Sequence, residues 1–182
     1  MKVIVAVTAA SGAIYARQSI ELLLKSGIVE RIALIYSRDA EAVAKAEGFV
    51  LPEDNRIECY NNDDMWASPA SGSARWDSML IVPSTMGTIG RIASGVSQSL
   101  IERAADVMLK ERRRLVIVAR EAPYSLIHLR NMTTLTEAGA VIIPASPSFY
   151  FNPSTIEELC FTISERAVEL AGVAVAHREW GE

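Results

Sequence analysis

The sequence predicts a single α/β domain over residues 1–182, built on a doubly wound parallel sheet. Its 182 residues suffice for one well-buried core and are few for two. Short apolar runs, rich in β-branched residues, alternate with longer stretches of helical pattern. Strands that are apolar at nearly every position are typical of parallel sheets covered on both faces. Their alternation with helices implies right-handed crossovers, and therefore a doubly wound sheet.

The strands are expected at five apolar runs. The first, residues 3–7, is short, rich in valine and soon followed by Ser11 and Gly12, which favours a buried strand over a signal peptide. The other runs read RIALIY, MLIV, LVIVA and AVII, at residues 31–36, 79–82, 115–119 and 140–143.

Helices are expected between these strands and after the last of them. They cover residues 13–25, 39–47, 87–94, 98–112, 125–138 and 155–171. Ser154 and Glu157 have the spacing of a capping box at the start of the final helix. Residues 52–75 break the alternation with asparagine, aspartate and small residues, so they are expected to form a long loop. Loops of this length in compact domains are usually functional or disordered.

Composition excludes several classes of function. A formal net charge of −4 argues against nucleic acid or an anionic membrane as a partner. No run reaches the roughly 18 apolar residues of a membrane span. Cys59 and Cys160 lie far apart and the chain has 2 histidines, so no metal site is expected. Unpaired thiols fit a reducing, cytoplasmic compartment. The positive mean hydropathy fits apolar surface hidden in an oligomer, or equally a generous core.

Small residues and hydroxyls follow the predicted strands, at the edge where an open parallel sheet binds ligands. These stretches are residues 8–13, 37–38, 83–88, 120–123 and 144–146. The first has no G-x-G-x-x-G fingerprint, and Ser11 there is either an ordinary N-cap or part of an anion site at a helix N-terminus. Thr85 and Thr88 form a second hydroxyl-lined loop, which favours the anion site. Tyr150 is either a core aromatic or a phosphate-binding hydroxyl.

Charged residues add two further candidates. Arg103, Asp106 and Lys110 share one helix face, either as a solvated salt-bridged stripe or as a cationic face held by Asp106. Arg120 and Glu121 follow an apolar strand directly, either as a structural ion pair or with the carboxylate as a proton carrier.

Taken together, these residues resemble the flavin prenyltransferases of the UbiX type. Matching stretches run in order along the chain, at residues 8–13, 69–73, 103–107, 109–113, 120–123, 139–144, 149–150 and 180–182. The resemblance implies a Rossmann-like or flavodoxin-like fold and a homododecamer built from trimers. It implies an enzyme that joins the dimethylallyl group of dimethylallyl phosphate to N5 and C6 of reduced FMN. The product, prenylated FMN, is the cofactor of UbiD-type decarboxylases.

The same resemblance implies roles for individual residues, several of them reaching the site from neighbouring subunits. FMN would contact Ala9, Ala10, Ser11, Ser37, Thr85, Met86, Gly87, Thr88 and Arg120. The dimethylallyl phosphate would be held by Arg103, Lys110, Tyr150 and Arg166, since preorganised cations and hydroxyls favour departure of the phosphate. The catalytic residues would be Glu121, Glu47, Ser11 and Trp66. Glu121 would protonate the leaving phosphate and then move the C6 proton, and the scheme needs no metal.

Two positions depart from the family's pattern. The family usually has glycine where this chain has Ala9, so the first loop must accommodate an extra methyl group. The family also tends to place an active-site tryptophan directly after an aspartate. Here the order is Asp64, Met65, Trp66, so that aromatic is displaced by one position or replaced by Met65.

The same fold could also serve two other functions. A flavin-dependent cysteine decarboxylase would need a histidine after the first helix and a P-x-M-N-x-x-M-W motif, but no histidine precedes His128 and the stretch at residues 83–86 does not match. A non-catalytic FMN carrier would not need Lys110, Glu121 and Arg166 to converge on a second phosphate.

Overall fold

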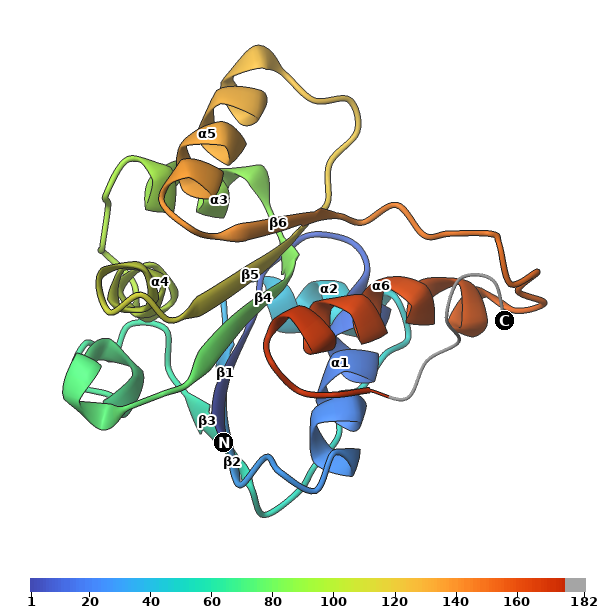
Figure 1. The fold of residues 1–182 in the computed structure, drawn as a ribbon, viewed down its shortest axis with the longest axis horizontal. Coiled ribbons are helices and arrows are strands. Elements are labelled where there is room, and N and C mark those ends of the chain that lie inside the picture. Colours follow the sequence, from blue (N-terminus) through green and yellow to red (C-terminus); the bar gives the residue numbers. More distant parts are fainter. Residues whose placement is uncertain (176–182) are drawn as a thin grey trace.

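The apolar runs of the sequence form a parallel sheet in the computed structural model, which describes residues 1–175 (Figure 1). Within that range the sheet has 6 strands in the order β3-β2-β1-β4-β5-β6, and every pairing is parallel. Their bounds are β1 Lys2–Val7, β2 Arg31–Tyr36, β3 Ile57–Tyr60, β4 Ser78–Ser84, β5 Arg114–Ala119 and β6 Val141–Pro144. This order belongs to Rossmann-like, doubly wound sheets, which confirms the predicted fold class.

Helices cover both faces of the sheet, as the all-apolar strands require. Their bounds are α1 Ala13–Lys25, α2 Ala40–Ala46, α3 Met86–Ala93, α4 Leu100–Lys110, α5 Leu126–Glu137 and α6 Ile156–Leu170. On one face α1 and α6 pack against each other and against the sheet, and on the other lie α3, α4 and α5 (Figure 1). Among residues 1–175, no helix is long and apolar enough to cross a membrane.

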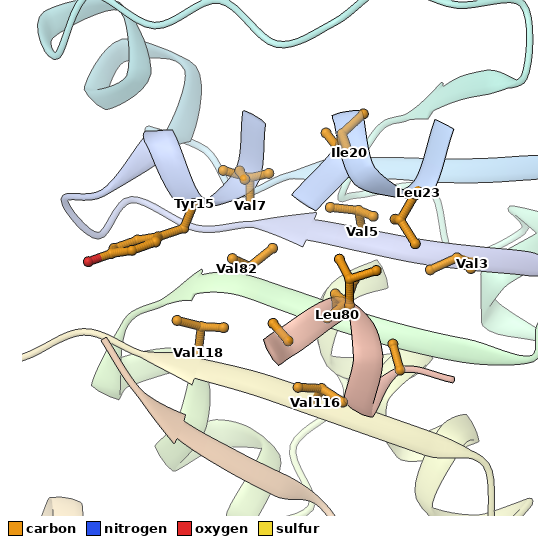
Figure 2. Close-up of a cluster of buried hydrophobic side chains, with 14 of the residues drawn as sticks. Val3, Val5, Val7, Tyr15, Ile20, Leu23, Leu80, Val82, Val116 and Val118 are labelled. Carbon is orange, nitrogen blue, oxygen red and sulfur yellow. The ribbon is translucent and has the colours of Figure 1, made fainter. Parts of the chain in front are cut away.

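Alternate residues of each central strand enter different cores, because side chains along a strand point to opposite faces. Val3, Val5 and Val7 of β1 pack under α1 and α6 with Leu80 and Val82 of β4 (Figure 2). The residues between them join a second core with α3 and α4. Each central strand is thus buried on both sides, and its carboxyl end is held rigidly.

The predicted loop at residues 52–75 is wrong in one respect, because it contains β3. This strand pairs with β2 from Ile32 and Ile57 to Ile35 and Tyr60. It lies at the sheet edge with Glu58 and Cys59 exposed, so it lacks the apolar run that marks the central strands. Two short 3-10 turns follow, η1 Ser68–Ala70 and η2 Gly72–Ala74.

The capping box predicted from Ser154 and Glu157 is wrong by one residue. Thr155 is the N-cap of α6 and its hydroxyl accepts from the backbone N–H of Glu158 at 3.1 Å. The Glu158 carboxylate accepts from the backbone N–H of Ser154 at 2.7 Å. Two hydroxyl residues precede two glutamates here, so the sequence allows either register.

Candidate active site

The loops after β1 and β4 are joined by one buried hydroxyl, that of Thr8. Its Oγ1 donates to the carbonyl oxygen of Pro83 at 2.8 Å and accepts from the backbone N–H of Thr85 at 2.9 Å. Thr8 is 1% exposed. The sheet order reverses between β1 and β4, and such a switch point is where doubly wound sheets bind ligands. Sequence reasoning included Thr8 in the loop but not among the site residues, although its hydroxyl directly follows a fully apolar strand.

The hydroxyl-lined loop at residues 85–88 opens α3. Thr85 is the N-cap, and its Oγ1 accepts from the backbone N–H of Thr88 at 3.2 Å and lies 3.0 Å from Thr88 Oγ1. Gly87 is exposed, whereas the side chain of Met86 packs into the core beneath. Thr88 is 3% exposed and Thr85 is partly exposed. A ligand at this loop therefore meets the Thr85 hydroxyl and bare backbone, and Met86 offers it main-chain groups alone.

The first loop holds an anion, but that anion belongs to the chain itself. The carboxylate of Glu47, at the end of α2, accepts from the backbone N–H of Gly12 at 2.9 and 3.0 Å and from that of Ala13 at 2.8 Å. Gly12, not Ser11, occupies the N-cap position of α1, with φ at 109°. Ser11 is therefore not the N-cap of α1. The anion at this helix N-terminus is the Glu47 carboxylate of the chain itself.

The environment of Glu47 stabilises its charged form. Partial burial by itself raises the pKa of the Glu47 carboxyl. Hydrogen bonds from the Ser11 side chain and from the N–H groups of Ala13 and Gly12 act in the opposite direction. The positive charge of Arg120 adds to them, and the resulting pKa lies below its ordinary value. Glu47, Ser11 and Arg120 therefore meet at one end of the sheet.

Ser37 and the two alanines of the first loop lie at this same edge. The backbone N–H of Ser37 donates to the carbonyl oxygen of Val7, at the end of β1, at 2.9 Å. Ala10 is buried and Ala9 is half-buried. The extra methyl group of Ala9 is thus accommodated without being forced into the core.

Arg120 and Glu121 leave β5 without pairing to each other. The backbone N–H of Arg120 donates to the carbonyl oxygen of Ser84 at 3.1 Å, beside the loop at residues 85–88. Its Nε is buried and has no hydrogen-bond partner within residues 1–175. Glu121 Oε1 accepts from the backbone N–H of Ala122 at 3.1 Å. The ion pairs among the described residues do not include Arg120 with Glu121, so both groups remain available to a ligand.

Arg103 lies in the first turn of α4, and Lys110 is the last residue of that helix. Arg103 donates to Asp106 at 2.6 Å and to the carbonyl oxygen of Ala70 in η1 at 3.1 Å, and Lys110 pairs with Glu111 at 2.5 Å. Lys110 precedes β5 and Arg120 follows it. A strand of 6 residues spans on the order of 20 Å, so the two cations occupy opposite edges of the sheet.

The other predicted residues come from three different segments of the chain. Tyr150, between β6 and α6, is 74% exposed, and Trp66, between β3 and η1, is 98% exposed. Arg166 of α6 pairs with Glu169 of the same helix at 2.5 Å. The structure therefore brings Ser11, Arg120 and Glu47 together, and it places Lys110 at the opposite end of β5.

Two further findings bear on the sequence predictions. Within residues 1–175, no three His, Cys, Asp or Glu side chains gather closely enough to hold a metal ion. The matched stretch at residues 180–182 lies outside the described residues.

Several known proteins are similar to this chain along its length. A family model described as Flavoprotein matches residues 1–169. The flavin prenyltransferases UbiX of Archaeoglobus fulgidus and Methanocaldococcus jannaschii are 41% and 37% identical, covering 100% of this chain and 100% and 99% of their own. The crystal structure of AnUbiX (PadA1) in complex with FMN and dimethylallyl pyrophosphate has a TM-score of 0.87 at 41% identity, over 98% of both chains. A dodecameric FMN-dependent UbiX-like decarboxylase from Escherichia coli O157:H7 has a TM-score of 0.91 at 34% identity, over 100% of both chains.

Proposed function

This chain belongs to the flavin prenyltransferases of the UbiX type, and on that premise we propose that it prenylates reduced FMN. The carbon–oxygen bond of dimethylallyl phosphate breaks as the bond to N5 of the flavin forms and the N5 proton is lost. The double bond of the attached group then gains a proton, its tertiary carbon bonds to C6, and the C6 proton leaves. Overall, phosphate and one proton are released. The prenylated FMN then passes to a decarboxylase of the UbiD type. The crystal structure of a relative contains dimethylallyl pyrophosphate, so this compound is the alternative donor to compare with dimethylallyl phosphate.

The observation that carries the proposal is the unpaired guanidinium nitrogen of Arg120. A buried donor without an acceptor is costly unless a ligand supplies one. FMN offers acceptors in its phosphate and its ring carbonyls, and the hydroxyl loop at residues 85–88 lies beside Arg120. The residues at this edge therefore fit a flavin that carries a phosphate group.

The remaining site residues take their roles in the proposal from this geometry. Ala9, Ala10, Ser11 and Ser37 would contact the flavin from the ends of β1 and β2, and residues 85–88 from the end of β4. Glu47 would hold Ser11 and the first turn of α1 in place through its hydrogen bonds. Glu121, which is half-buried at this edge, would donate the proton to the departing phosphate and accept the C6 proton.

Several copies of the chain would complete the site. Lys110 is separated from Arg120 by the length of β5, and Tyr150 and Trp66 project from the chain. A neighbouring copy would bring these groups to the flavin edge, as the resemblance implies. Leu126 and Ile127 on α5 are 61% and 68% exposed, which suits an interface between copies. We propose a homododecamer, the state of the Escherichia coli relative.

The proposal also covers the extent of the domain and the cellular compartment of the protein. Residues 1–182 would form one flavoprotein domain, since the family model covers residues 1–169 without interruption. The cytoplasm would be its compartment, because both cysteines are unpaired thiols.

The test is anaerobic incubation of the purified protein with chemically reduced FMN and dimethylallyl phosphate, followed by mass spectrometry of the flavin. A flavin heavier by one dimethylallyl unit, absent without protein, is the expected result. A parallel incubation with dimethylallyl pyrophosphate identifies the preferred donor. Recovery of unmodified FMN alone from both incubations would contradict the proposal and leave an FMN carrier as the better description.

A further inference from the structure

An ion pair between Arg91 and Glu102 lies behind the loop at residues 85–88 and has no part in the function proposed above. Arg91 Nε donates to Glu102 Oε1. The other carboxylate oxygen accepts from the backbone N–H groups of Gln98 and Ser99 at 2.9 and 3.1 Å, where α4 begins. The Glu102 side chain is 4% exposed and that of Arg91 is 50% exposed. Glu102 is thus fixed in place, and it fixes Arg91.

Arg91 in turn contacts the loop. Its Nη2 lies 3.4 Å from Thr88 Oγ1, which is itself 3.0 Å from Thr85 Oγ1. Its Nη1 lies beside Gly87, where an added Cβ would be 3.3 Å away. Helical side chains point back toward the helix N-terminus, so an arginine in the last turn of this short helix reaches its first turn. Gly87 leaves room for the guanidinium there.

This contact sets the direction of the loop's hydrogen bonds. A guanidinium has donors alone, so Thr88 Oγ1 accepts from Arg91. Because Thr88 is 3% exposed, its hydroxyl hydrogen goes to Thr85 Oγ1. The hydrogen of the partly exposed Thr85 hydroxyl is then left for an acceptor on a ligand. The guanidinium also brings a positive charge to the first turn of α3, where the helix dipole already disfavours a cation. Glu102 offsets part of that cost, and an anion bound at the loop would offset more.

We propose that Arg91, held by Glu102, is a positioning residue that makes the loop at residues 85–88 select a flavin bearing a phosphate group. Through the buried Thr88 hydroxyl it orients the Thr85 hydroxyl as a donor toward the ligand. A donor fixed in this direction favours the charged phosphate monoester of FMN over the neutral ribityl hydroxyl of riboflavin. The inference rests on the proposed function in one respect, namely that FMN binds at this loop.

The test compares dissociation constants of oxidised FMN and riboflavin for the intact wild-type protein and its variants, by quenching of flavin fluorescence. We expect Arg91→Ala to raise the Kd for FMN about tenfold and that for riboflavin less than about twofold. Arg91→Lys keeps the charge and should restore part of the preference. Arg31→Ala is the matched control, because it removes another arginine–glutamate pair, with Glu58, at the amino end of β2. It should leave both constants unchanged.

A second variant separates selectivity from stability, because Arg91→Ala leaves the buried Glu102 carboxylate without its cation. In the double variant Arg91→Ala with Glu102→Gln, the glutamine oxygen still accepts at the start of α4. We expect it to regain the thermal stability but not the preference for FMN. Equal weakening of both flavins by Arg91→Ala, or recovery of FMN affinity in the double variant, overturns the inference. Failure of the proposed function would look different: the wild-type protein would bind FMN and yield no prenylated product.

Discussion

Glu47 caps the first turn of α1 by accepting the backbone N–H of Ala13 at 2.8 Å. The carboxylate comes from the end of α2, so one ionised side chain joins two helices at the carboxyl edge of the sheet. Anions are favourable at helix N-termini, which can bind a ligand phosphate. Because Glu47 already occupies this one, we expect the flavin phosphate at the loop at residues 85–88 and at Arg120.

The first prediction concerns the stability that Glu47 provides. Its folded-state pKa is depressed, so its contribution is fully present above the unfolded pKa and is lost as pH falls through the folded value. Glu47→Gln should therefore lower the unfolding free energy by about 1 kcal/mol at pH 7. The difference should shrink as pH falls below the ordinary carboxyl pKa of 4.5. Thermal melts of both proteins between pH 7 and pH 3 measure it, and a pH-independent difference would contradict the assignment.

The second prediction concerns the link between the loops after β1 and β4. Thr8→Val keeps the shape of the side chain but leaves the Pro83 carbonyl and the Thr85 N–H without their partner. We expect a loss of about 2 kcal/mol in unfolding free energy and weaker FMN binding, because buried polar groups left unpaired are costly. Urea unfolding and FMN titration measure the two effects.

Thr133→Val provides the comparison for this prediction. Thr133 is exposed on α5 and its hydroxyl donates to the carbonyl oxygen of Leu129 in its own helix. That substitution should change stability by less than about 0.5 kcal/mol and leave FMN binding unchanged. If the two valine variants behaved alike, the Thr8 link would have no special role.

The third prediction concerns proton transfer by Glu121. Glu121→Gln should bind FMN as the wild type does but form prenylated flavin at least about a hundredfold more slowly, since glutamine cannot exchange a proton. Single-turnover assays under anaerobic conditions separate the two steps. Glu137→Gln, an exposed glutamate at the end of α5, is the control. Normal turnover by Glu121→Gln would remove this residue from the acid–base role.

The sequence was sufficient to predict the central strands because each is apolar on both faces. It missed β3 because an edge strand with exposed Glu58 and Cys59 carries no such run. Residues 8, 37, 85 and 120 could be placed at one edge because parallel strands end together. The contacts that organise this edge could not be predicted, since Thr8 with Pro83 and Glu47 with Gly12 join positions 75 and 35 residues apart.

The predicted phosphate-binding residues show a different limit of prediction from sequence. Arg103 and Lys110 share the helix face that their spacing predicted, but Arg103 donates to η1 and Lys110 pairs with Glu111 of its own chain. A pattern within one chain fixes which residues share a surface. It does not say which surface of another copy faces them, so their role rests on the family resemblance and stays a prediction.

The last prediction tests whether Lys110 and Glu121 serve one active site from different copies of the chain. Each lies beyond an opposite end of β5, so within one chain they are separated by on the order of 20 Å. Lys110→Ala and Glu121→Gln should each be nearly inactive alone.

The two variants can be co-expressed with different affinity tags and purified through both tags. This should yield mixed oligomers in which some sites receive an intact Lys110 from one copy and an intact Glu121 from another. Random mixing in equal amounts would give about a quarter of the wild-type rate. The two pure variants, each purified through its own tag and then combined without exchange of subunits, provide the baseline. Activity of the mixed oligomers no higher than that baseline would show that both residues act within the same chain, and the site would then require a rearrangement of α4 relative to β5.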